Sequence, residues 1–244
     1  MKKLLVSFAS TLGLLSLAFA PAQSAAATAY SPYDPAMHAG AAYVVDALHL
    51  HPTQFCLGFR EVAYKAQLLD RMTPAQATAF MQHKNVPVVI GPEGVPYLAD
   101  GHHTVRSLLE SNQPDKRVYG HILANWRSLS PAEFWERMAA NHYAYLKGAR
   151  GQGPLDPAGL PATLLTMQSD PYRSLAWGLL MRHGFKEVHG PSGFFQEFHW
   201  GDYLRNKVRW DDRDDASFQR AVDEALSLAH APSASGLPGY IPAS

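Results

Sequence analysis

The chain has 244 residues with 21 basic and 21 acidic side chains, so its formal net charge is zero. That balance gives no overall electrostatic basis for binding nucleic acid or an anionic membrane. The single cysteine, Cys56, excludes an internal disulfide and is expected to be a small buried hydrophobe. Packing must therefore stabilise the fold, and 5 Trp, 11 Tyr and 11 Phe residues supply bulk for it.

The amino-terminal segment, residues 1–27, has the layout of an export signal. Two lysines follow Met1, residues 4–20 are uncharged and mostly apolar, and small residues come next. This order is typical of a secretory signal peptide. The alternative is a membrane anchor, but the apolar run falls short of the roughly 20 mostly apolar residues that span a bilayer. We expect residues 1–27 to be removed and the mature protein to act in the periplasm or outside the cell.

A polar lead-in, residues 28–45, comes before the first well-patterned segment. A short helix is expected over residues 40–48, and Pro52 indicates a turn soon after it. In residues 59–72 the apolar side chains recur three and four positions apart, which predicts a helix. These side chains are Val62, Ala66, Leu69 and Met72.

The next segment alternates between helix and strand signals. Residues 73–76 read Thr-Pro-Ala-Gln, which has a capping residue, a proline and a glutamine at the positions that begin a helix. Residues 86–90 and 95–98 are apolar with a Gly-Pro turn between them, which predicts a hairpin. A helix over residues 103–111 and a strand over residues 118–123 follow.

The second half of the chain is predicted to be helical up to residue 230. Helices are expected over residues 130–146, 170–184, 194–208 and 216–230, with a loop rich in glycine and proline at 148–161. The last residues, 231–244, are mostly proline, serine, glycine and alanine and are expected to be a disordered tail. The fold class is therefore α+β: a core over residues 46–128 with a small mixed sheet and helices, and a helical half over residues 129–230 packed on it.

The turn between a predicted strand and a predicted helix at Asp100 is the leading site candidate. The first N–H groups of a helix have no partners within it and carry the positive end of its dipole, so they form an anion pocket. Gly101 lets a phosphate or carboxylate approach the backbone. Asp100 could cap the helix or hold a metal or a hydroxyl, and His103 could act as acid or base. Further ligand-binding candidates are His102, Thr104 and Arg106, the last with a planar fork. The alternative is a helix capped by Asp100 with two exposed histidines.

A second candidate lies on the helix predicted over residues 59–72. Glu61 and Lys65 are four positions apart, so they share one helical face next to Arg60. Glu61 could be a general base or a metal ligand, and Lys65 and Arg60 could contact phosphate. The alternative is an ion pair on the solvent side.

Charged residues stand among aromatic residues in two segments of the second half. Residues 170–177 include Arg173, and residues 197–205 include Glu197 and Asp202. Buried charges are usually paired. Either these side chains pair with one another to hold the helices together, or they close over the first-half site as a wall.

The histidine pattern does not predict a structural zinc site. There are 12 histidines, but neither His49 and His51 nor His102 and His103 have the spacing of a helical zinc motif, and no cysteine pair assists them. A divalent metal such as Mg²⁺ held by carboxylates is compatible with the sequence.

In the order helix, strand hairpin, Asp-Gly-His-His and helix, the chain resembles the ParB/sulfiredoxin-like superfamily. Over residues 46–210 it is similar to the ParB-like nucleases within it. Four phrases carry the resemblance: Phe-Arg-Glu-Val-Ala at 59–63, Ala-Asp-Gly-His-His at 99–103, Asp-Pro-Tyr-Arg-Ser-Leu-Ala at 170–176 and Glu-Phe-His-Trp-Gly-Asp at 197–202.

The resemblance implies a phosphate site on residues 101–106. Within the superfamily, sulfiredoxins use ATP, DNA-partition proteins bind a nucleotide and free-serine kinases use ADP. Sulfiredoxins have a catalytic cysteine where this chain has His102. Partition proteins have an arginine pair and a helix-turn-helix that this chain lacks. The kinases are the closest likeness, because Glu61 matches their early catalytic glutamate.

Three hypotheses follow. The first is an exported enzyme acting on a nucleotide, a nucleic acid or another phosphate-bearing molecule, as a metal-dependent phosphodiester hydrolase. The second is a non-enzymatic domain that binds the anion, and a phosphotransferase resembling the free-serine kinases is a variant of the first. The third, a role in DNA partition, conflicts with export.

Overall fold

A five-stranded mixed sheet organises the first half of the chain. The computed structural model describes residues 29–190 and 193–243. The strand order is β1-β2-β6-β4-β5, with β1 at Ser31–Pro32, β2 at Ala42–Asp46, β4 at Val86–Ile90, β5 at Pro96–Leu98 and β6 at Arg117–Asn125. Strands β4 and β6 run parallel, whereas β4 and β5 form the antiparallel hairpin that the sequence predicts. The expected α+β class is confirmed.

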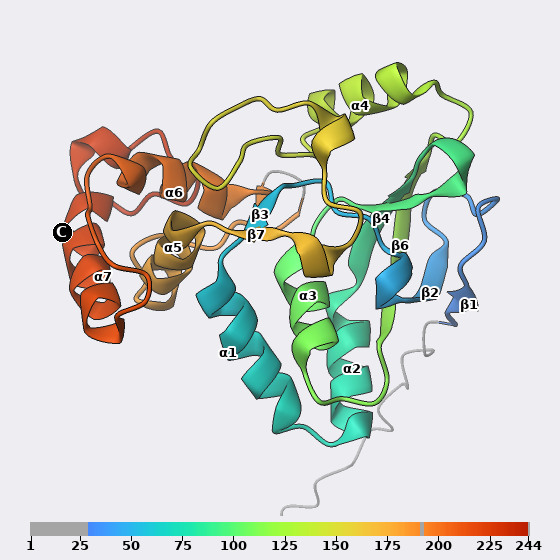
Figure 1. Cartoon of the computed structure of the whole chain (residues 1–244), viewed down its shortest axis with the longest axis horizontal. Coiled ribbons are helices and arrows are strands. Elements are labelled where there is room, and N and C mark those ends of the chain that lie inside the picture. The colour runs from blue at the N-terminus through green and yellow to red at the C-terminus, as the bar shows by residue number, and fades with distance from the viewer. Residues whose placement is uncertain (1–28, 191–192, 244) are drawn as a thin grey trace, which may run out of the picture.

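Helices cover both faces of this sheet. Helices α1 (Phe59–Asp70), α2 (Pro74–Lys84) and α3 (His102–Glu110) lie on one face, and α4 (Pro131–Ala140) lies on the other (Figure 1). Successive side chains of a strand point to opposite faces, so in β4 Val88 and Ile90 pack toward α1–α3 whereas Val89 packs toward α4. All five residues of β4 are buried, which makes it the centre of the core.

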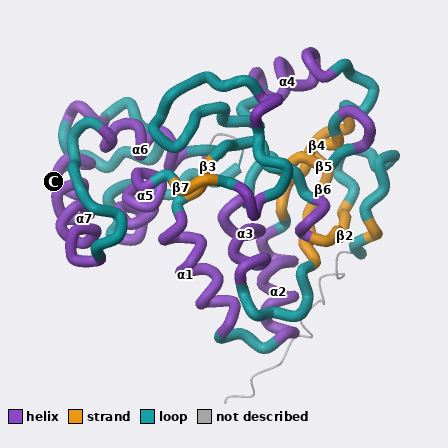
Figure 2. The backbone as a smooth tube through the Cα atoms, viewed as in Figure 1, coloured by secondary structure: helices purple, strands orange, loops and turns teal. Residues whose placement is uncertain are grey.

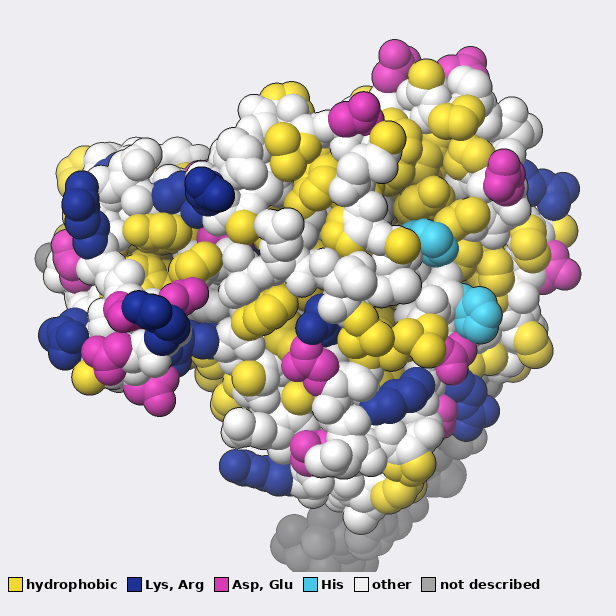
Figure 3. Space-filling model, in the orientation of Figure 1, with side chains coloured by type: hydrophobic (Ala, Val, Ile, Leu, Met, Phe, Trp, Pro, Cys, Tyr) yellow, Lys and Arg dark blue, Asp and Glu magenta, His cyan; other side chains and the backbone are white. Residues whose placement is uncertain are grey.

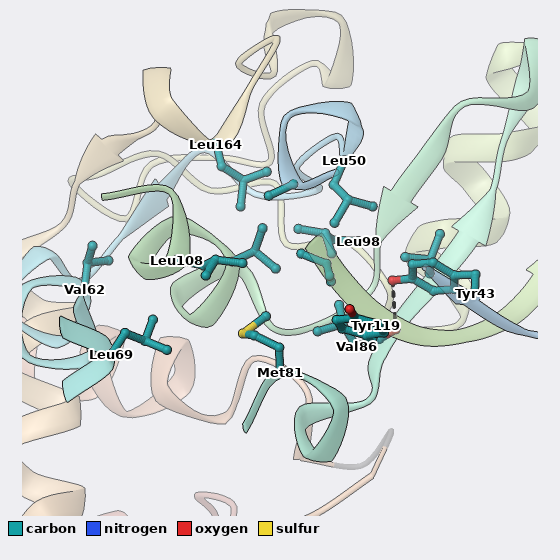
Figure 4. Close-up of a cluster of buried hydrophobic side chains, with 14 of the residues drawn as sticks. Tyr43, Leu50, Val62, Leu69, Met81, Val86, Leu98, Leu108, Tyr119 and Leu164 are labelled. Carbon is teal, nitrogen blue, oxygen red and sulfur yellow. Dashed lines mark hydrogen bonds between the residues drawn. The ribbon is translucent and has the colours of Figure 1, made fainter. Parts of the chain in front are cut away.

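The main hydrophobic cluster fills the space between the sheet and α1–α3. Figure 4 shows it: Leu69 and Met81 from the helices meet Leu98 from the sheet. At its edge the Tyr43 hydroxyl is satisfied, because it donates to the Val86 carbonyl oxygen over 3.0 Å. Helix α2 begins with the predicted capping box, in which Thr73 and Gln76 bond each other's backbone.

The second half forms a group of helices on the side of the molecule away from β1 and β2 (Figures 1 and 2). Helices α5 (Pro171–Met181), α6 (Gln196–Arg205) and α7 (Asp215–Ala229) share a second hydrophobic cluster centred on Trp200. On the face shown in Figure 3, basic and acidic side chains are interspersed over this part rather than separated by sign.

A short parallel pair of strands joins the two halves. Strand β3 (Cys56–Leu57) pairs with β7 (Gln168–Ser169), directly before α1 and α5 begin. Gly58 follows β3, and a Cβ there would lie 2.7 Å from the Ser174 backbone nitrogen. Only glycine therefore lets the start of α1 approach the start of α5 this closely.

Three expectations about local structure are wrong. Residues 40–48 contain strand β2 rather than a helix, because the Tyr-Val-Val run pairs with β6. The sheet therefore starts inside the segment expected to be a lead-in. Helix α4 ends at Ala140, not near residue 146, because His142 adopts a positive φ of 56°.

The third error concerns the tail. Residues 231–243 pack on the second cluster: the Pro238 carbonyl oxygen accepts from Gln196 Nε2 and from Trp200 Nε1, and Tyr240 pairs with Phe185. The small residues of the tail led to the prediction of disorder, whereas its few apolar and aromatic residues account for the packing.

The predicted export signal, residues 1–27, lies outside the described residues. None of the helices in residues 29–190 and 193–243 combines the length and the hydropathy needed to cross a bilayer.

Candidate functional site

Helix α3 begins without a side-chain cap. Gly101 occupies the cap position with a positive φ of 86°, and among the described residues no side chain bonds to the first N–H groups of the helix. These donors and the helix dipole favour an anion at this end. The alternative of an Asp100-capped helix with two exposed histidines is wrong, because His102 and His103 are both buried.

The two histidines are held by backbone groups and differ in their partners. His102 Nε2 accepts from the Thr53 N–H over 3.1 Å, which ties the segment before β3 to the start of α3. His103 Nε2 accepts from the Gly58 N–H over 2.9 Å. Burial lowers the pKa of His102 well below its ordinary value, and burial lowers that of His103 to about 3. Both rings are therefore neutral at neutral pH, and His103 is a hydrogen-bonding group there rather than an acid.

Glu61 lies beside His103 on the first turn of α1. Its Oε1 pairs with Lys65 Nζ at 2.5 Å, and its Oε2 lies 3.4 Å from His103 Nε2. Burial alone would raise the pKa of Glu61, but the charges of His103, Lys65 and Arg173 around it lower that pKa to about 2. Because His103 is itself neutral at neutral pH, Lys65 is the counter-ion that matters. The predicted pair of Glu61 and Lys65 is thus an interior pair, since the Glu61 side chain is only 4% exposed.

Arg173 and Glu197 reach the same place from α5 and α6. Their Nη1 and Oε2 atoms are 3.0 Å apart, and Arg173 Nη2 lies 3.5 Å from His103 Nδ1. The guanidinium is stacked 3.9 Å from the centre of the Phe198 ring. Burial and the nearby charge of Glu61 raise the pKa of Glu197 to about 7, against the opposing effect of Arg173. The second half therefore forms a wall beside the start of α3.

These groups surround a cleft of about 210 Å³. Lys65, Lys84 and Arg173 supply positive charge to its lining, and Asp100, Glu187 and Glu197 supply negative charge. Asp100 is exposed at the rim, but the cleft walls remove part of its carboxylate from water, and this desolvation raises its pKa. Gly101 and Thr104 also line the cleft, and Glu61 lies behind Lys65 and His103.

Three predicted site residues point elsewhere. Arg60 pairs with Asp215 of α7 and covers the Phe218 ring. Arg106 lies on the far side of α3, where it bonds Glu110 and the Leu164 carbonyl oxygen. A sequence spacing of one helical turn does not fix the direction of a long side chain.

Asp202 is the third displaced residue. It pairs with Lys147 and accepts from the Tyr145 hydroxyl over 2.9 Å, and it lies 3.6 Å from Arg205 Nε. It therefore holds the 141–150 segment to α6 and takes no part in the cleft, because it sits on α6 more than one turn beyond Glu197.

Several residues of the site were not singled out from the sequence, and three of them matter most here. Gln54 and Lys84 line the cleft, and Gly58 bonds His103. Gly58 stands between a short strand and a helix, as Gly101 does, so a second strand–glycine–helix turn was a usable signal. Nothing in the local pattern marks Gln54 or Lys84.

One group of side chains in the described residues could offer donors to a metal ion: Glu61, His103 and Glu197, with donor atoms within 4.8 Å of one another. His103 is poorly suited, because the Gly58 N–H occupies its Nε2 lone pair and Arg173 faces its Nδ1. The two carboxylates alone suit Mg²⁺, which binds through one or two carboxylates together with water and phosphate oxygens.

Comparisons with known proteins agree with this architecture. The family model described as "Putative ParB-like nuclease" matches residues 43–206. Protein Atu1540 from Agrobacterium tumefaciens, known from a crystal structure, is 32% identical, with a TM-score of 0.71 over 83% of this chain and 97% of that one. No curated protein matches the sequence significantly.

Proposed function

The chain belongs to the ParB-like nuclease family, and from that premise we propose that it binds a phosphate-bearing ligand at the start of α3 and hydrolyses a phosphodiester there. The observation that carries the proposal is the uncapped first turn of α3, which opens into the same cleft as Lys65 and Arg173. Free N–H groups and fixed cations are the groups that bind phosphate in proteins.

The phosphate oxygens would accept from the N–H groups of His102, His103 and Thr104. Lys65 and Arg173, whose side chains are 24% and 4% exposed, would neutralise the charge that develops on these oxygens during transfer. The cleft of about 210 Å³ is smaller than most ligand pockets. It has room for a phosphate and the atoms next to it, so the rest of a nucleotide or nucleic acid would lie outside.

Two carboxylates with different proton affinities flank the proposed phosphate position. Glu61, with a pKa of about 2, stays ionised and would orient a water molecule or hydroxyl. Glu197, with a pKa of about 7, is matched to taking up and releasing a proton at neutral pH. Asp100 at the rim would bind a group of the ligand outside the cleft. The tuned pair supports hydrolysis over binding alone.

The proposal includes a divalent ion such as Mg²⁺. Glu61 would hold it together with water and phosphate oxygens, and when bound it would supply positive charge to the phosphate oxygens. Lys65 and Arg173 already balance both carboxylates, which favours weak binding of the ion in the absence of ligand.

Hydrolysis of bis-p-nitrophenyl phosphate, with and without Mg²⁺, tests the proposal. We expect Glu61→Gln to lower the rate at least about 100-fold, as removal of a positioned catalytic group does. Glu110→Gln is a matched control, because Glu110 is also an acid paired to a cation four positions away but lies outside the cleft. Phosphate binding without hydrolysis by the wild type would favour a binding domain, and failure to bind phosphate would refute the site.

We also propose that the protein is exported, on the pattern of residues 1–27. Amino-terminal sequencing of protein recovered from the periplasm or medium should find a chain beginning between about residues 22 and 30. Recovery of a chain that still begins with Met1 would refute export with cleavage.

A further inference from the structure

Gln54 has an unusual environment for a buried amide. Its residue is 2% exposed and lines the cleft, yet its Oε1 atom is buried without a hydrogen-bond partner among the described residues. Buried side-chain acceptors are nearly always paired, so an unpaired one needs a specific reason. The neighbouring residue is firmly placed, because Thr53 bonds both His102 and the Leu98 carbonyl oxygen.

A second buried acceptor near this cleft also lacks a hydrogen-bond partner among the described residues. Glu61 Oε2 is also buried and lacks a hydrogen bond, although it lies near His103. These are the two unpaired oxygens among the buried side chains of residues 29–190 and 193–243, since the other unpaired atoms are nitrogens of arginine or tryptophan. The unpaired oxygens of Gln54 and Glu61 would each be satisfied by a hydrogen-bond donor of a ligand. A phosphate dianion offers none, so phosphate alone would leave both oxygens unpaired.

We propose that Gln54 is a specificity-determining residue, which binds a hydroxyl group of the ligand on a carbon close to the phosphate. This inference rests on the proposed function and narrows the ligand to hydroxyl-bearing phosphate esters. The uncharged amide oxygen of Gln54 accepts from a hydroxyl without adding charge to a lining in which Lys65, Lys84 and Arg173 already face three carboxylates. Gln54 follows Thr53, whose N–H bonds His102 at the start of α3. A hydroxyl bound by Gln54 must therefore lie close to a phosphate bound at that helix start.

Two three-carbon esters provide a matched comparison. Glycerol 3-phosphate has a hydroxyl on the carbon next to the ester carbon, whereas n-propyl phosphate has the same chain without hydroxyls. In isothermal titration of the wild type we expect the glycerol ester to bind about 10-fold more tightly, which is the effect of one buried hydrogen bond. Inorganic phosphate, titrated in parallel, reports on the anion pocket alone.

The variant Gln54→Met keeps the side-chain volume and removes the amide. It should bind both esters equally, with the affinity of the wild type for n-propyl phosphate. Gln113→Met is the control: Gln113 is also buried, but it bonds the carbonyl oxygens of Leu69 and Met72 outside the cleft. This control variant should retain the preference for the glycerol ester even if it loses stability.

The outcomes separate the two claims. Equal binding of both esters by the wild type, or a preference that survives in Gln54→Met, would overturn the role of Gln54 while leaving the phosphate site intact. Failure of the wild type to bind any of the three probes would refute the phosphate site and this inference together. Should Gln54→Met fail to fold, the side-chain amide resonances of Gln54 in the wild type decide: they should shift with the glycerol ester and stay in place with the propyl ester.

Discussion

Replacing Arg173 by methionine should weaken phosphate binding strongly while leaving most of the fold stable. Methionine fills similar space without charge, so the change removes the ion pair with Glu197 and the stacking on Phe198. Arg205→Met is the matched control. Arg205 is also on the second half and also largely buried, but it bonds both carboxylate oxygens of Asp170 away from the cleft.

The structure predicts that Arg205→Met loses mainly stability, whereas Arg173→Met loses mainly affinity for phosphate. Without Arg205, the Asp170 carboxylate keeps the Tyr172 N–H but loses its cation at 1% exposure, which costs about 3–5 kcal/mol of unfolding free energy. Without Arg173, Glu197 can take up a proton near neutral pH, because its pKa is already about 7. The loss is then mainly the cation–π contact, about 0.5–2 kcal/mol. A lost charged hydrogen bond to phosphate, however, weakens binding by about 10- to 150-fold.

Urea unfolding and isothermal titration with inorganic phosphate measure the two effects separately. Arg173→Met should show the smaller loss of stability and the larger loss of affinity, and Arg205→Met should bind phosphate normally in its folded fraction. Wild-type affinity in Arg173→Met, together with a stability loss as large as that of Arg205→Met, would refute a binding role and leave Arg173 as a structural partner of α6.

Three further predictions concern single residues. The folded-state pKa of Glu197 is raised from 4.5 to about 7, so the folded state binds this proton more tightly and the unfolding free energy should fall as pH rises from about 4.5 to 7. In urea titrations Glu197→Gln should remove that part of the pH dependence, and an unchanged pH dependence would contradict the assignment. Gly101→Ala should cost about 1–2 kcal/mol in unfolding free energy, because φ is 86°, and wild-type stability would show that the turn relaxes freely. Burial raises the pKa of Cys56 to about 12, so a thiol reagent such as Ellman's should label it only on unfolding; rapid labelling of the native protein would contradict its burial.

Local signals were sufficient for the parts of the fold that depend on neighbouring residues. The capping box at Thr73 and the proline after it fix the start of α2 because they act within one turn. The uniformly apolar run of β4 predicted a buried strand, and the glycine at position 101 predicted the turn into α3. The carboxylate at Glu61 meets this turn only through packing, and the family resemblance supplied that expectation.

Long-range contacts determined what could not be predicted. The segment around Tyr43 is a strand because β6 lies beside it, and a helical reading of the same residues was equally compatible with the local pattern. Arg60 and Arg106 leave the cleft because Asp215 and the Leu164 carbonyl oxygen attract them from segments far along the chain. In the sequence Gln54 looks like an ordinary polar loop residue. In the fold it forms an isolated parallel β-bridge with Tyr145, which is far along the chain.

Backbone chemical shifts measured during a titration with inorganic phosphate test the central claim most directly. If the start of α3 is the phosphate site, the amide resonances of Gly101, His102, His103 and Thr104 should show the largest shifts, and they should saturate together with those of the Arg173 side chain. Shifts confined to other surfaces, such as the groove beside Leu48 and His49, with the α3 amides unmoved at saturating phosphate, would contradict the account.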